Sequence, residues 1–199
     1  YVHTGGQNNL DGMMQAFTHS NVTVCDLRKK LTDAAAESEY PLYFKRDSHW
    51  NNKGALLVYN EMMNALGKSH NTYEDASVRR ARIHTGDLGA MIYPASDEKE
   101  WDYEYEMAES YKYTKGLTPN EEVSVEDARI ESINPSGEDT LLMYRDSFGN
   151  TLIPFFSEEF ETAYYSKGIP ASAASDIEKY SPDYVVIERV ERSLSDYVK

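Results

Sequence analysis

The sequence is poor in cysteine and has no long apolar run. Its single cysteine, Cys25, excludes an intramolecular disulfide, and the surrounding apolar run VTVC at 22–25 favours a buried small residue over a nucleophile. No apolar stretch approaches the roughly 20 residues that a membrane helix needs. The chain begins at Tyr1 instead of Met, which indicates a trimmed N-terminus, so the lack of a signal peptide does not identify the compartment.

Basic residues are also scarce. The chain has 20 Lys and Arg against 34 Asp and Glu, which gives a formal net charge of -14. Without a basic patch to neutralise phosphates, nucleic acid is disfavoured as a partner. The same charge disfavours long-range attraction of a polyanionic substrate.

Apolar residues, in contrast, are sufficient for folding. They make up 40% of the 199 residues, enough for one domain with a sizeable core. Sixteen tyrosines are unusual. Tyrosine offers a flat face and a hydroxyl and therefore suits a polysaccharide-binding surface, although tyrosines are also common in β-strands.

The first third of the chain predicts alternating loops, strands and helices. Residues 1–21 are polar and predict a loop, and two short apolar runs predict strands at 22–26 and 42–45. Helices are expected at 27–39 and 55–66, the second with Gly67 as its C-cap.

Residues 68–138 are more charged and differ in pattern. Alternating tracts at 77–84, 101–106 and 122–133 predict half-buried antiparallel strands, with a short helix near 86–91. We interpret this region as an insertion with its own small antiparallel sheet within a single domain spanning 1–199. The alternative is a flexible acidic surface region.

From residue 139 onward, strands and helices alternate. Strands are predicted at 141–144, 160–166 and 183–188, the last with a continuous buried core, and helices after 148, at 173–180 and at 189–198. This order predicts an α/β fold with a parallel sheet and right-handed crossovers.

The segment LLMYRDSFGN at 141–150 holds the first candidate for chemistry. Ser147 lies where the predicted strand ends and a helix begins, which is the edge at which open α/β sheets bind ligands. The free N–H groups at a helix start can hold an oxyanion. The alternative is that Ser147 only caps the helix.

Asp47 and His49 form the second candidate. Two residues apart, they can point the same way, so the carboxylate can orient the imidazole and leave its other nitrogen to take a proton from Ser147. Asp47 could instead cap the following helix, as Asn51 and Asn52 could, and His49 could pack beside Trp50. A metal site would need further ligands, and the remaining histidines have no recognisable spacing: His3, His19, His70 and His84.

The segment YFKRDSHWNNKGA at 43–55 resembles the signature of the DHHW family, which is similar to the SGNH-hydrolase-like proteins of alginate O-acetylation. Three later segments match in order: GDL at 86–88, RDSFGN at 145–150, and PDYVVI at 182–187 with ER at 191–192. Two positions depart from the family pattern. Ser48 occupies the second place of the Asp-His-His-Trp signature, and Arg145 replaces the glycine of a Gly-Asp-Ser block.

The resemblance implies a three-layer α/β/α SGNH-hydrolase-like (flavodoxin-like) fold and a triad of Ser147 as nucleophile, His49 as base and Asp47 as its orienting carboxylate. It implies an oxyanion site at the backbone of Ser147 and Gly149. Candidate oxyanion or substrate contacts are Gly149, Asn150, Arg145 and Trp50.

The function implied by the resemblance is transfer or hydrolysis of acetyl groups on extracellular polysaccharides, without a cofactor. The expected partners are a polysaccharide or acetylated sugar and a membrane acetyl-donor system, and the expected location is the cell surface or the exterior. The competing hypothesis is a non-catalytic carbohydrate-binding or assembly module on the same fold. A metal-dependent hydrolase is a third.

Overall fold

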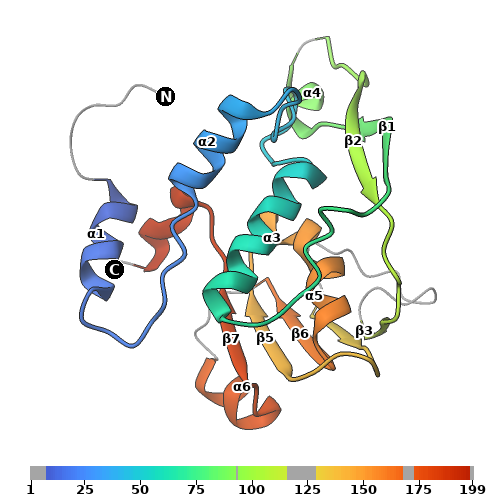
Figure 1. The fold of residues 1–199 in the computed structure, drawn as a ribbon. Coiled ribbons are helices and arrows are strands. Elements are labelled where there is room, and N and C mark those ends of the chain that lie inside the picture. The colour runs from blue at the N-terminus through green and yellow to red at the C-terminus, as the bar shows by residue number, and fades with distance from the viewer. Residues whose placement is uncertain (1–7, 93, 116–128, 168–172, 198–199) are drawn as a thin grey trace.

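The structure, a computed structural model, describes residues 8–92, 94–115, 129–167 and 173–197 (Figure 1). The α-helices are α1 Asn9–Phe17, α2 Arg28–Glu37, α3 Asn52–Leu66, α4 Asp87–Met91, α5 Ile153–Glu159 and α6 Ala173–Tyr180. The 3-10 helices are η1 Phe148–Leu152 and η3 Glu191–Tyr197. The strands are β1 Val78–Thr85, β2 Lys99–Tyr105, β3 Lys112–Lys115, β4 Ile130–Ile133, β5 Thr140–Tyr144, β6 Thr162–Ser166 and β7 Tyr184–Ile187.

A five-stranded sheet in the order β3-β4-β6-β5-β7 forms the centre of the fold. Strand β5 pairs in parallel with both β6 and β7, which confirms the predicted parallel pairing after residue 139. Strands β3 and β4 add to the same sheet in antiparallel orientation, so the sheet is mixed. Of the predicted small sheet, β1 and β2 form a separate antiparallel ribbon, and residues 122–128 lie outside the described residues.

One face of the central sheet is covered by α3, η1 and α5 (Figure 1). Helix α3 buries a stripe at i, i+3, i+4, i+7 and i+8 against it, as an amphipathic helix should: Ala55, Val58, Tyr59, Met62 and Met63. The helix ends at Gly67, whose φ of +69° is the left-handed conformation that glycine adopts readily. This packing fixes where the N-terminus of α3 lies relative to β5.

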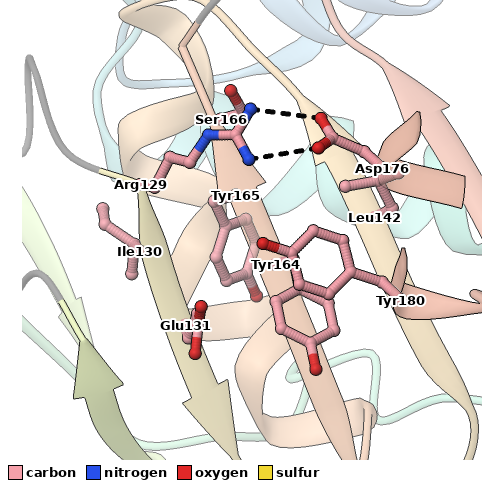
Figure 2. A pocket seen from close by; sticks show the side chains of 9 residues that line it. All are labelled: Arg129, Ile130, Glu131, Leu142, Tyr164, Tyr165, Ser166, Asp176 and Tyr180. Carbon is pink, nitrogen blue, oxygen red and sulfur yellow. Dashed lines mark hydrogen bonds and ion pairs between the residues drawn. The ribbon is translucent and has the colours of Figure 1, made fainter. Parts of the chain in front are cut away.

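Helix α6 packs on part of the opposite face, so the described part of the chain forms the expected three layers. Figure 2 shows Tyr164 stacked on Tyr180 of the helix, with ring centroids 3.9 Å apart. Asp176 accepts a hydrogen bond from the Tyr144 hydroxyl at 2.6 Å and pairs with Arg129 at 3.1 Å. The cavity left between these residues is about 10 Å³, which holds at most a single water molecule. This contact therefore fastens α6 to the sheet and is not a ligand pocket.

Strand β7 corrects one prediction. The sequence predicts a continuously buried strand at 183–188, but Val185 and Ile187 are exposed on the face that carries α6. The reason is that β7 is the edge strand and the described part of α6 does not extend over these side chains. Burial on one face alone, through Val186, is enough to hold the strand against β5.

Several N-terminal predictions are wrong. Residues 9–17 form α1 within the predicted loop, with a capping box between Asn8 and Asp11. Residues 22–26 and 42–45 are not strands: the first has no strand pairing, and the second has only a single bridge from Tyr43 to Trp50. Cys25, in the first of these segments, is exposed and not buried as predicted. The C-terminal helix is present as the 3-10 helix η3.

No helix within the described ranges combines the length and the hydropathy needed to cross a membrane.

Candidate active site

Ser147 lies three residues beyond the carboxyl end of β5, at the start of η1. Its side chain makes no capping hydrogen bond to the helix, which answers the capping alternative. The neighbouring Asp146 does this work instead: its Oδ1 accepts the Phe148 N–H at 2.8 Å and its Oδ2 accepts the Val190 N–H at 2.8 Å. The Ser147 hydroxyl is therefore available to a side chain from elsewhere in the chain.

That side chain is His49. Its Nε2 lies 2.7 Å from Ser147 Oγ, and its Nδ1 lies 2.6 Å from Asp47 Oδ1. The His49 backbone N–H also donates to Asp47 Oδ1 at 2.9 Å, so the carboxylate folds back on its own loop. A carboxylate on Nδ1 and a hydroxyl on Nε2 is the arrangement in which imidazole can accept the hydroxyl proton. The structure thus brings the three predicted residues together in the predicted order.

The loop that carries Asp47 and His49 is held by the start of α3. Asn51 is the N-cap of this helix, and its Oδ1 accepts the N–H groups of Lys53 at 3.0 Å and Gly54 at 3.1 Å. Asn51 therefore caps helix α3, and Asp47 is not needed as a cap and contacts His49 instead. The indole N–H of Trp50 donates to Thr151 Oγ1 at 2.8 Å and so joins this loop to η1.

Two of the residues predicted to contact substrate, Trp50 and Arg145, are buried in the structure. Trp50 is only 5% exposed and packs edge-on against Phe148. Arg145 is fully buried beneath the serine loop, where its guanidinium donates to Asn150 Oδ1 and, at 3.2 Å, to the Asp146 carbonyl. Both side chains hold the loop that carries Ser147.

The predicted oxyanion donors lie on this same loop. Within the described part of the chain, the backbone N–H groups of Ser147 and Gly149 have no hydrogen-bond acceptor, whereas the Phe148 N–H is used by Asp146. Gly149 is packed so closely that an added Cβ would lie 2.7 Å from Arg145 Cβ and 2.8 Å from Glu188 Oε2. The serine loop can therefore pack this closely on Arg145 and Glu188 only because position 149 has no side chain.

Sequence reasoning missed two residues, His84 and Asp87. His84 Nε2 lies 2.7 Å from Asp47 Oδ2, to which the Asp87 N–H also donates at 3.2 Å. The Asp87 carboxylate accepts from Ser48, through its N–H at 3.0 Å and its hydroxyl at 2.8 Å. The GDL segment at 86–88 was the available signal for Asp87. His84 had none, because its partner is 37 residues away.

These contacts set the charge of Asp47. Burial opposes its ionisation, but the hydrogen bonds from His84, from His49 and from the backbone together outweigh burial and lower the pKa of Asp47 to about 2. Asp47 is therefore a carboxylate at any pH at which an enzyme would be assayed. Beneath the loop, burial and the charge of Asp146 raise the pKa of Glu188 to about 8.

Asp47, His49 and Asp87 also form a group that could hold a metal ion, with ligand atoms within 4.8 Å of one another. Each of these atoms already has a partner: His49 contacts Asp47 and Ser147, and Asp87 holds Ser48. A metal at this place would compete with these hydrogen bonds, which include the 2.6 Å contact between His49 and Asp47. The hydrogen bonding therefore favours the triad as the organisation of these residues.

Solved structures resemble this chain in fold at low sequence identity. A DHHW family protein from Eubacterium siraeum is 16% identical with a TM-score of 0.74, covering 98% of this chain and 74% of that one. PatB1 of Bacillus cereus with a sulfonyl adduct is 17% identical with a TM-score of 0.57, covering 92% and 67%. The O-acetyltransferase domain of Pseudomonas putida AlgJ is 14% identical with a TM-score of 0.56, covering 94% and 65%.

No curated protein sequence matches the chain significantly. A family profile does: that of the SGNH hydrolase-like domain, acetyltransferase AlgX, matches residues 2–125. The match is more than half of the chain and includes Asp47, His49, His84 and Asp87, while Ser147 lies beyond it. With the SGNH-like fold, it confirms the resemblance stated from the sequence. The chain therefore belongs to the family of SGNH hydrolase-like domains of the acetyltransferase AlgX type.

Proposed function

We propose that this protein is a serine-dependent acetyl ester hydrolase or O-acetyltransferase that acts on cell-surface or secreted polysaccharide. The observation that carries the proposal is the continuous contact from Asp47 Oδ1 through His49 to Ser147 Oγ, at 2.6 and 2.7 Å. Support for the acetyl group comes from the family profile and from the similar fold of AlgJ, whose solved part is an O-acetyltransferase domain.

In the first half-reaction, His49 Nε2 takes the hydroxyl proton of Ser147 as Oγ attacks the carbonyl carbon of an acetyl ester. The carbonyl oxygen becomes an oxyanion near the N–H groups of Ser147 and Gly149, which would stabilise it. When the ester bond breaks, the departing oxygen receives the proton from His49, and the acetyl group stays on Ser147. Asp47 stabilises the transient imidazolium throughout.

In the second half-reaction, a hydroxyl group takes the acetyl group from Ser147. His49 removes the proton of the incoming hydroxyl and returns it to Ser147 Oγ as the acyl bond breaks. Water as acceptor gives an esterase, and a sugar hydroxyl gives a transferase. The net charge of -14 favours a polysaccharide of low negative charge as acceptor. Such a substrate places the activity at the cell surface or outside the cell.

The test is turnover of p-nitrophenyl acetate by the wild type and by Ser147→Ala, with mass spectrometry of the acetylated enzyme. We expect turnover in the wild type, its loss in Ser147→Ala, and an added acetyl group on the peptide that contains Ser147. As a control, Ser110→Ala changes an exposed serine whose hydroxyl contacts Glu158, and it should retain full activity.

Turnover that persists in Ser147→Ala would refute the proposal. Absence of both turnover and adduct in the wild type, with acetylated oligosaccharides also unchanged, would favour the non-catalytic carbohydrate-binding module. Metal content that tracks with activity would instead favour the group of Asp47, His49 and Asp87 as a metal site.

A further inference from the structure

A second histidine contacts the carboxylate of the candidate triad. His84 belongs to β1, in the ribbon outside the central sheet, and its Nε2 lies 2.7 Å from Asp47 Oδ2. The His84 ring lies flat on Phe44, with centroids 3.7 Å apart and 11° between the planes. The ring is therefore fixed by stacking on one side and by a hydrogen bond at its tip.

The contacts to Asp47 divide cleanly between its two oxygens. Oδ1 faces its own loop, where it accepts from His49 Nδ1 and the His49 N–H. Oδ2 faces the ribbon and the start of α4, where it contacts His84 and accepts the Asp87 N–H at 3.2 Å. Because the Oδ2 side holds the carboxylate, Oδ1 is left pointing at His49.

Asp47 needs such support because its loop has no regular secondary structure. The neighbouring strand β2 supports the same loop, since the Glu100 carboxylate accepts the N–H groups of Lys45 at 2.8 Å and Arg46 at 2.7 Å. Glu100 lies directly opposite His84 in the ribbon. The ribbon therefore contacts the loop backbone through one strand and the Asp47 side chain through the other.

We propose that His84 is a positioning residue, which donates its Nε2–H to Asp47 Oδ2 and so holds Asp47 Oδ1 against His49 Nδ1. The effect of His84 on turnover rests on the proposed function, whereas its effect on the contact between Asp47 and His49 is independent of that function. Without this donor the carboxylate can turn away, and His49 then loses the partner that keeps its proton on Nδ1 and Nε2 free for Ser147.

Two substitutions separate the two contacts of His84. His84→Gln keeps an N–H donor at about the position of Nε2 but removes the ring. His84→Phe keeps a ring to stack on Phe44 but removes the donor. With p-nitrophenyl acetate, we expect kcat to fall roughly 10- to 100-fold in His84→Phe at unchanged KM, and to stay within about threefold of the wild type in His84→Gln.

The matched controls are His70→Phe and His70→Gln. His70 is also a part-buried histidine with contacts at both ring nitrogens, but these are to the Lys68 carbonyl and to Asn60. Both controls should retain wild-type kcat. If His84→Phe does not fold, His84→Asn replaces it, because this amide is too short to reach Asp47 and should lower kcat equally.

The second readout does not depend on turnover. In the wild type and in His84→Gln, the proton between His49 Nδ1 and Asp47 should give a far-downfield resonance in the NMR spectrum of protein with 15N-labelled histidine. In His84→Phe this resonance should weaken or disappear. A His84→Phe variant with wild-type kcat and an unchanged resonance would overturn the proposal.

The two readouts also separate the two proposals. A wild type that neither turns over ester nor forms an adduct would defeat the proposed function, while the resonance would still decide the role of His84. Wild-type turnover with equal losses in His84→Gln and His84→Phe would defeat the donor role and leave the proposed function intact.

Discussion

At the scale of single residues, the site depends on the hydrogen bonds that both carboxylate oxygens of Asp47 accept. Its side chain is only 6% exposed, yet both oxygens accept hydrogen bonds and its pKa is about 2 despite burial. A buried carboxylate keeps its charge only when such donors surround it. Asp47 is thus suited to orienting His49 and stabilising its charged form, and not to giving or taking protons itself.

This role predicts a large effect of Asp47→Asn. The new amide would donate to His49 Nδ1, which forces the histidine proton onto Nε2. A protonated Nε2 cannot accept the hydroxyl proton of Ser147. We expect kcat for p-nitrophenyl acetate to fall about 10³- to 10⁴-fold with little change in KM. Asp33→Asn, at an exposed position on α2, should have no effect. Activity of Asp47→Asn within threefold of the wild type would show that this carboxylate is not part of the machinery.

At the scale of elements, the sequence predicted best where the pattern is local. Helix α3 buries apolar residues at helical spacing, β5 buries a continuous apolar run, and β6 buries Ala163 and Tyr165 on one face, so a local pattern marks each element. The predicted strands at 22–26 and 42–45 are equally apolar but lack a paired neighbour. A strand depends on a partner that its own sequence does not specify, and this is why these two predictions were wrong.

Helix α1 was missed although two local signals mark it. Leu10, Met13, Met14 and Phe17 stand at i, i+3, i+4 and i+7, which is helical spacing, although none of them is fully buried. The second signal is the capping box, in which Asn8 accepts the Asp11 N–H at 2.9 Å and Asp11 accepts the Asn8 N–H at 3.1 Å.

A further prediction concerns Gly86, where the ribbon meets the loop that carries Asp47. A Cβ there would lie 2.0 Å from the Arg46 carbonyl oxygen and 3.0 Å from the Asp47 N–H nitrogen. The Leu88 N–H donates to the same carbonyl at 3.0 Å, so the two segments cannot separate without losing that bond. Gly86→Ala should therefore lower the free energy of unfolding by about 1–3 kcal/mol and displace Asp47, with at least tenfold lower kcat.

Urea unfolding and ester turnover measure these two effects. Gly12→Ala is the matched control, because Gly12 lies in α1 with nothing within 4 Å of an added Cβ. Alanine favours a helix over glycine, so this variant should be as stable as the wild type or more stable by up to about 1 kcal/mol. If Gly86→Ala behaves like Gly12→Ala, the close contact is not required for stability or for the site.

At the scale of the whole molecule, the site joins parts of the chain about 100 residues apart. The sequence predicted that Ser147 would lie beyond a strand end, and β5 bears this out. It placed Asp47 and His49 at the end of a neighbouring strand, whereas they lie on a loop. That loop meets β5 because α3 packs across the sheet and because the ribbon returns to it through His84 and Glu100. Such contacts depend on tertiary packing, which spacing in one sequence does not reveal.

The same packing buries the carboxyl group of Glu188, and its titration should make the stability of the folded protein depend on pH. Glu188 follows β7, is 8% exposed, and accepts the Asp146 N–H at 3.1 Å through Oε2. Burial first, and then the charge of Asp146, raise its pKa from 4.5 to about 8. Between these values the folded protein keeps the proton that the unfolded chain releases, so stability must fall as pH rises from about 4.5 to about 8.

Glu188→Gln should remove this dependence, because its amide oxygen can still accept from Asp146 but cannot ionise. We expect its melting temperature to match the wild type near pH 5 and to exceed it near pH 9, where the wild type buries a charge that costs at most about 5 kcal/mol. Thermal melts at half-unit pH steps measure the difference, with Glu37→Gln, exposed on α2, as the control that should follow the wild type. Parallel curves for Glu188→Gln and the wild type from pH 5 to 9 would mean that Glu188 is ionised in the folded protein, and that the serine loop rests on a charged carboxylate instead of a neutral one.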